Sequence, residues 1–134
     1  MEMAEYLRIA ETEDEGARLF FRLRSGTSDL RVDRDRRFGV AHEDRCCTLC
    51  AAHSVEDVRH VLAECPAHAD ARRSLLNKLP AELRDLHDDQ VIDALMGSNV
   101  IRNLCPDRVA RWAAIHASKA FWARVFRLRR ERDA

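Results

Sequence analysis

The chain has 134 residues, of which 46% are hydrophobic and 34% are charged, and its formal net charge at pH 7 is zero. This length and composition predict a single soluble globular domain, 1–134, and exclude a disordered chain or two independently folded units. Because no apolar run is long enough to cross a bilayer and no secretion signal begins the chain, we expect an intracellular protein of the cytoplasm or nucleus, with no membrane partner.

The charges are segregated along the sequence. Residues 1–15 form an acidic segment with six acids and one base, 18–37 hold seven arginines and three aspartates, and 108–130 hold seven basic residues and no acid. Arginine suits phosphate, because its planar fork donates two parallel hydrogen bonds, but charge runs more often solubilise a helix face. Arginine content alone therefore predicts no partner.

The first elements are predicted to be two short helices. Residues 2–10 are rich in acids and are a candidate helix. Residues 16–24 place Phe20 and Leu23 on one face and arginines on the other, which is the pattern of an amphipathic helix. Gly26 is a natural C-terminal cap for this second helix.

A polar connector precedes the first cysteines. Residues 29–45 alternate arginine and aspartate with few apolar groups, so we expect a loop there, with a short extended piece at 30–32. Residues 47–50, Cys-Thr-Leu-Cys, should form a tight turn. Residues 54–57, Ser-Val-Glu-Asp, resemble a capping box and predict that the next helix begins at the serine.

Pro66 predicts where that helix ends, because proline directly after Cys65 stops or kinks it. On a continuous α-helix, residues five apart diverge by about 140°, so His60 and Cys65 would not face one ligand. A helix end at Cys65 removes the conflict.

The C-terminal half is also predicted to be helical. Helices are expected at 67–79, ended by Pro80, and from the aspartate pair at 88–89 to residue 96, with a weaker turn over 81–86. The longest helix should run over about 107–131. We therefore predict an all-α fold, a small multi-helix domain with a zinc knuckle, formed by the Cys47–Cys50 turn and the helix that follows it to Cys65, and a long C-terminal amphipathic helix.

Four potential metal ligands fall within nineteen residues: Cys47, Cys50, His60 and Cys65. A Cys3His set is a common closed ligand group for structural zinc, and it leaves no open position for water, which argues against metal catalysis. We expect one structural Zn²⁺, no enzymatic activity, and a zinc-binding core over 18–79 followed by C-terminal helices over 88–132. In a reducing compartment five cysteines favour metal over disulfides.

The register of the ligands has alternatives. Cys46 can replace Cys47, and His53 or His68 can compete with His60. Two intervening residues are the usual spacing of a metal knuckle, which favours Cys47. A redox Cys-x-x-Cys would need a βαβ setting that this helical sequence lacks.

Several strings together resemble the zinc-binding region near the C-terminus of non-LTR retrotransposon reverse transcriptases. They are Phe20-Phe-Arg-Leu-Arg-Ser-Gly-Thr27, the Cys47-x-x-Cys50 pair, Val55-Glu-Asp57, and His60-Val-Leu-Ala-Glu-Cys65-Pro66. The likeness covers about 18–79 and extends more loosely to the closing basic helix. The resemblance implies a non-catalytic accessory module that helps to hold template RNA or target DNA, with the four Cys and His residues as metal ligands.

This sequence also departs from that family, because it has no polymerase palm. The aspartate pair at 88–89 lacks the aromatic residue that a polymerase site places two positions earlier, so we expect a helix N-terminus there. Because the chain begins with methionine, we expect a complete protein, either a decayed fragment or a free-standing module with a changed role.

Two functions follow from the sequence. The first is binding of RNA or DNA through arginine–phosphate contacts. The second is a protein-interaction or scaffold module, which the acidic N-terminus and zero net charge suit, since nucleic-acid domains are usually basic. The arginines expected at phosphates form one set near the knuckle and one in the last helix: Arg18, Arg22, Arg24, Arg31, Arg34, Arg36, Arg37, and Arg124, Arg127, Arg129, Arg130.

Overall fold

The computed structural model describes residues 15–133, so the helix expected at 2–10 lies outside the described residues. The described part is all-α, as predicted, and its only β pairing is an isolated bridge between Cys46 and Val55. Helices (α) and short helical turns (η) follow in this order: α2 Glu15–Ser25, α3 Arg31–Arg34, η1 Asp35–Phe38, η2 His42–Asp44, η3 His60–Glu64, η4 Pro66–His68, α4 Ala69–Lys78, η5 Ala81–Leu83, α5 Asp89–Leu95, α6 Ile101–Leu104 and α7 Arg108–Asp133.

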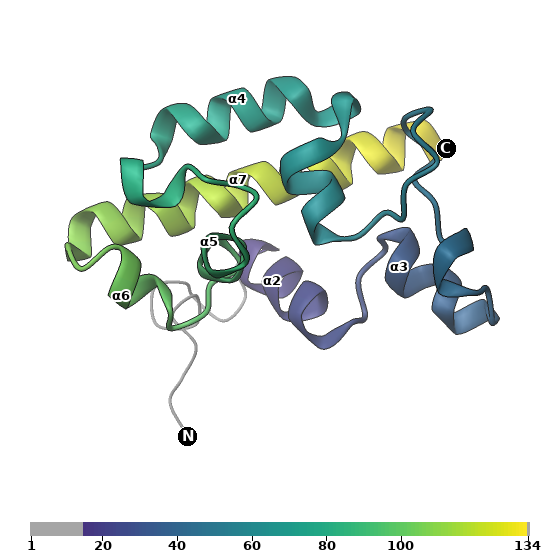
Figure 1. Ribbon diagram of the computed structural model, residues 1–134, viewed down its shortest axis with the longest axis horizontal. Coiled ribbons are helices and arrows are strands. Elements are labelled where there is room, and N and C mark those ends of the chain that lie inside the picture. Colours follow the sequence, from purple (N-terminus) through teal and green to yellow (C-terminus); the bar gives the residue numbers. More distant parts are fainter. Residues whose placement is uncertain (1–14, 134) are drawn as a thin grey trace.

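The C-terminal helix α7 is the element on which the other long helices pack (Figure 1). Helices α4 and α2 make the most extensive contacts with it, and α5 also touches it. The Asp107 carboxylate accepts a hydrogen bond from the Ala110 N–H at 3.0 Å and caps its start, close to the predicted position. Within residues 15–133, none of the helices combines the length and the apolar character that a bilayer-spanning segment needs.

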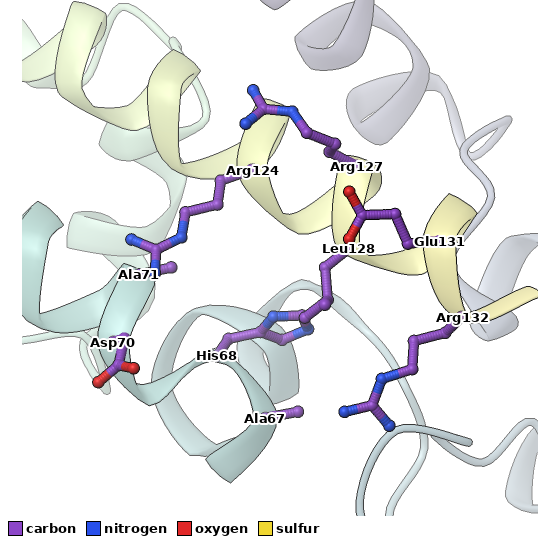
Figure 2. Close-up of a pocket in the computed structure, with 9 residues that line it drawn as sticks. All are labelled: Ala67, His68, Asp70, Ala71, Arg124, Arg127, Leu128, Glu131 and Arg132. Atoms are coloured by element: carbon purple, nitrogen blue, oxygen red, sulfur yellow. The ribbon is translucent and has the colours of Figure 1, made fainter.

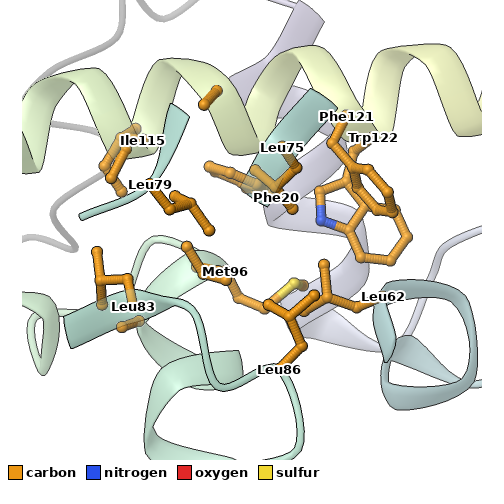
Figure 3. Close-up of a cluster of buried hydrophobic side chains, with 14 of the residues drawn as sticks. Phe20, Leu62, Leu75, Leu79, Leu83, Leu86, Met96, Ile115, Phe121 and Trp122 are labelled. Carbon is orange, nitrogen blue, oxygen red and sulfur yellow. The ribbon is translucent and has the colours of Figure 1, made fainter. Parts of the chain in front are cut away.

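One hydrophobic cluster joins α2, η3, α4, α5 and α7 (Figure 3). Phe20 of α2 and Leu62 of η3 are fully buried, as are Ile115 and Trp122 on one face of α7. Each large apolar side chain contributes about 1.5–3 kcal/mol by leaving water. Because Leu62 belongs to the knuckle segment, the same cluster fixes the candidate metal ligands relative to α7.

The connector is helical, so the prediction of a loop with an extended piece at 30–32 is wrong. Residues 31–38 form α3 and η1. The buried Asp33 carboxylate accepts hydrogen bonds from the Ser28 hydroxyl at 2.6 Å and the Ser28 N–H at 3.2 Å. Arg31 forms an i,i+4 ion pair with Asp35 at 3.3 Å. Polar side chains, rather than an apolar stripe, organise this segment.

The helix after the cysteine turn begins later than the capping box predicted. Ser54 lies in an extended segment, where its carbonyl accepts a hydrogen bond from the Cys47 N–H at 2.9 Å. Helical residues begin at Val58, and the Asp57 carboxylate caps them by accepting the His60 N–H at 2.8 Å. The cap is therefore the aspartate, because the serine is used to close the knuckle turn.

A buried ion pair ties the knuckle to α7. The Glu56 side chain is 0% exposed and that of Arg129 is 4% exposed, and the Arg129 guanidinium donates a hydrogen bond to the Glu56 carboxylate. The other carboxylate oxygen of Glu56 accepts the Arg31 N–H at 2.7 Å. Arg129 is therefore a structural residue, and its predicted place among the phosphate-binding arginines is wrong.

Replacing Arg129 by methionine should lower the free energy of unfolding by about 3–5 kcal/mol, because the Glu56 carboxylate is left buried without its charged partner. Urea unfolding followed by circular dichroism measures the change. The matched control is Arg73→Met, which breaks the exposed pair of Arg73 with Asp70 and should cost less than about 1 kcal/mol. The double variant Glu56→Gln/Arg129→Met should be more stable than Arg129→Met alone, and a less stable double variant would contradict the ion pair.

Candidate metal centre and arginine surfaces

The structure brings together the four residues that the sequence singled out as metal ligands. The ligand atoms of Cys47, Cys50, His60 and Cys65 all lie within 4.8 Å of one another, so the group can hold one metal ion. Cys47 and Cys65 are buried, as is His60, whereas Cys50 is partly exposed. The group thus lies at the edge of the core, with one thiol facing the surface.

The distances fit a tetrahedral metal site. The Sγ atoms of Cys47 and Cys65 are 3.9 Å apart, and the Sγ of Cys50 is 3.5 Å from Nε2 of His60. With metal–sulfur bonds of about 2.3 Å and metal–nitrogen bonds of about 2.0–2.1 Å, the edges of a tetrahedron are about 3.8 Å and 3.6 Å. A disulfide needs about 2.05 Å between sulfurs. The spacing therefore matches ligation and not oxidation.

A π-helical turn aims His60 and Cys65 at the same point. Residues 60–64 form η3, in which the Cys65 N–H donates to the His60 carbonyl at 2.6 Å, a bond between residues five apart. This wider turn places such residues one above the other, which an α-helix does not. The helix end predicted at Cys65 is present, with ψ of 121° there, and Pro66 opens the next turn. The sequence predicted the end but not the π turn.

Arg72 holds the end of this turn and was missed by the sequence analysis. Its guanidinium donates hydrogen bonds to the carbonyls of Val61, Leu62 and Cys65 at 3.1, 2.8 and 2.8 Å. A helix that ends after a π turn leaves such carbonyls without partners inside the helix. The available signal was an arginine seven residues after Cys65. The helical repeat of apolar residues does not single out this arginine.

The surroundings disfavour free thiolates when no cation is bound. Burial is the main cause that raises the pKa of Cys47 to about 11, with smaller contributions from the Cys65 and Cys50 thiols, while the Leu49 N–H lowers it. Burial also raises the pKa of Cys65. The Leu49 N–H lies 3.4 Å from the Cys47 sulfur. The site therefore favours thiolates only together with a positive charge, which is the chemistry of a metal ligand set.

The alternative ligands lie elsewhere. Cys46 directs its Sγ to the carbonyls of Glu43 and His53, at 3.4 and 3.6 Å. His53 is exposed and has a left-handed backbone, with φ of 54°. His68 is buried, but it lines a pocket against α7 rather than the cysteine group. Cys47 and His60 are therefore the residues that share a site with Cys50 and Cys65.

The arginines predicted near the knuckle are largely used within the protein. Arg24 pairs with Asp93 at 3.6 Å and Arg37 with Asp29 at 3.8 Å. Arg31 pairs with Asp35, and Arg36 donates a hydrogen bond to the Gly26 carbonyl at 2.6 Å. The half-buried Arg34 and the exposed Arg18 also have interaction partners.

A second group of predicted arginines is exposed on α7 and on the neighbouring α2. Arg22 and Arg130 line a pocket of about 70 Å³ between these helices. Arg124 and Arg127 line a pocket of about 370 Å³ on the α4 side. None of these four guanidiniums forms an ion pair with a side chain that the structure describes. The group of Arg22, Arg124, Arg127 and Arg130 is called the α7 arginine surface below.

Comparison of the chain with protein-family models, with curated proteins and with solved structures gives no match.

Metal affinity should rise steeply with pH. At pH 7 the Cys47 and Cys65 thiols of the metal-free protein are protonated, because burial raises the pKa of both, and each must lose its proton to bind a cation. With at least two protons released, log affinity should increase by at least about 2 for each pH unit between pH 6 and 8. Competitive titration with Co²⁺ at three pH values measures this slope, and an affinity independent of pH would contradict ligation by these thiols.

Proposed function

We propose that the chain is a non-catalytic, zinc-stabilised module that binds RNA or DNA, mainly through contacts between arginines and phosphates. The observation that carries the proposal is the α7 arginine surface, whose guanidiniums are exposed and unpaired among the described side chains. By contrast, the arginines of the connector mostly have internal partners. Guanidinium groups without internal carboxylates are the ones available to phosphate oxygens.

Zinc is the metal that this donor set favours. Three thiolates and one imidazole in a tetrahedron are a common closed zinc site, whereas Mg²⁺ and Ca²⁺ require oxygen ligands. Four protein ligands leave no position for a reacting water, which supports a structural role. Three thiolates around Zn²⁺ carry one excess negative charge. The Arg72 guanidinium lies beside this site, because it donates a hydrogen bond to the Cys65 carbonyl.

The resemblance to the C-terminal zinc-binding region of non-LTR retrotransposon reverse transcriptases is part of the proposal. Its support is the gathering of Cys47, Cys50, His60 and Cys65, the ligands that the resemblance implies. In that interpretation the module holds nucleic acid beside a polymerase or has been retained for another role. A reverse-transcriptase reading frame directly upstream in the genome would support the derivation.

A protein-interaction module is the second candidate, and exposed apolar side chains favour it. Val109 and Trp112 lie one helical turn apart on α7 and are 74% and 52% exposed. Phe38 on η1 is 77% exposed and Phe21 on α2 is 61% exposed. Exposed aromatic groups are typical anchors at protein interfaces. Apart from Val109 and Trp112, these side chains lie on different elements.

Removal of the metal should unfold the protein. Zinc ligation contributes roughly 10 kcal/mol or more in small zinc domains, which is as large as the stability of a typical domain. Chelation, or the variant Cys65→Ser, should therefore abolish the cooperative thermal transition and reduce the far-UV circular dichroism signal. The matched control Cys46→Ser changes a neighbouring cysteine outside the site and should stay within about 0.5 kcal/mol of the wild type. Unchanged melting after chelation would contradict a structural metal.

Binding to nucleic acid should weaken steeply with salt. For single strands, log affinity against log salt has a slope of about −0.7 for each phosphate neutralised. Fluorescence anisotropy with labelled 12-nucleotide RNA and DNA strands measures it. The variant Arg22→Gln/Arg127→Gln/Arg130→Gln should reduce the slope by about 2. The variant Arg24→Gln/Arg37→Gln/Arg108→Gln changes the net charge equally and should leave the slope unchanged. Absence of binding at low salt would favour the protein-interaction function.

A further inference from the structure

The larger pocket lies between the start of α4 and the end of α7. Its volume is about 370 Å³. The knuckle side contributes Ala67 and Ala71, with His68 between them, and α7 contributes Arg124 and Arg132. Figure 2 shows Arg124 and Arg132 extending to opposite sides of the His68 ring, while Arg127 points away from the other lining residues.

The balance of charge in this pocket is positive. Arg124, Arg127 and Arg132 are exposed and form no ion pair with any side chain that the structure describes. Of the two lining carboxylates, that of Asp70 is paired with Arg73 at 3.1 Å. Glu131 is the other. The Arg124 and Arg132 guanidiniums flank the pocket, and Glu131 is its one lining carboxylate without an ion pair among the described side chains, which makes the pocket suited to an anion.

His68 forms a fixed and neutral part of the wall. The side chain is 2% exposed, and its Nε2 has no hydrogen-bond partner among the described residues. Burial, and to a lesser extent Arg72 and His60, lower the pKa of His68 to about 4, so the ring is uncharged at neutral pH. The backbone N–H of His68 donates a hydrogen bond to the Cys65 carbonyl at 3.2 Å. The knuckle therefore sets the position of the ring.

We propose that this pocket accepts one phosphate group of a nucleic-acid strand, together with the adjoining sugar, between Arg124 and Arg132. The inference rests on the proposed function and names the site at which the strand is held. The volume falls at the lower end of the range for ligand pockets, which leaves room for more than a phosphate alone. Its lining contains no exposed aromatic ring on which a base can stack, so the pocket fits backbone rather than base.

The test compares two variants that remove the same charge. Arg124→Gln/Arg132→Gln removes the guanidiniums of the pocket, and Arg24→Gln/Arg108→Gln removes two exposed guanidiniums outside it. Binding of labelled 12-mers of oligo(dT) and oligo(rU) is measured by anisotropy across a salt series. The pocket variant should bind at least about tenfold more weakly and lose about 0.7 from the salt slope, the share of one phosphate. The control variant should match the wild type.

A second readout uses the wild-type protein. Addition of unlabelled oligo(dT) should shift the backbone amide resonances of His68 and Ala71, because the strand lies against them. If the wild type binds, but the two variants bind alike and these resonances do not move, the strand is held elsewhere. In that case the proposed phosphate site is wrong and the proposed function stands. If the wild type binds neither strand at low salt, both proposals fail.

Discussion

Glu56 is the residue at which three parts of the chain meet inside the protein. Its carboxylate takes hydrogen bonds from the Arg31 backbone and the Arg129 guanidinium, and its side chain is fully buried. Its backbone is also fixed, since its carbonyl accepts the Val32 N–H at 3.1 Å and its N–H donates to the Arg45 carbonyl at 2.9 Å. A buried carboxylate that lacks any of these partners is costly, so connector, knuckle and α7 must dock together.

This requirement explains how a segment with few apolar residues is held in one conformation. Within 38–57, only Cys47 and Glu56 are buried. The usual driving force for folding is therefore weak there. The cysteine and histidine group, which can hold a metal ion, on one side and the Glu56–Arg129 pair on the other provide the constraints instead. Because the two constraints act on the ends of the same short stretch, loss of either should loosen the other.

The sequence predicted the features that depend on local chemistry. Gly26 has the left-handed backbone of a helix cap, with φ of 73°, and the Asp88 carboxylate caps α5 by accepting the Gln90 N–H at 2.8 Å. The four Cys and His side chains come together in the structure, because the spacing of such ligands can be recognised in the sequence. Asp107 likewise marks the start of the last helix.

The remaining features depend on contacts between distant residues. The partner of Glu56 lies 73 positions away, and no local pattern distinguishes Arg129 from the exposed arginines beside it. The helix cap is Asp57 rather than Ser54, because Ser54 pairs with Cys47, seven positions earlier, in an extended segment. The π turn at His60 directs two candidate ligands five residues apart to one point, and helix propensities do not encode such a turn.

Zero net charge is compatible with a strongly positive surface, because the charges are compensated in different places. In the connector, arginines and aspartates alternate and pair with one another, as Arg31 does with Asp35. Between 108 and 130 there is no acid, so arginines on the outer face of α7 have none within their own helix. Arg127 and Arg130 are three residues apart, so they are neighbours on the helix surface and about 4.5 Å apart along the axis, well within one Debye length of about 10 Å at 0.1 M salt. A strand on this face would meet their combined field, whatever the sum over the chain.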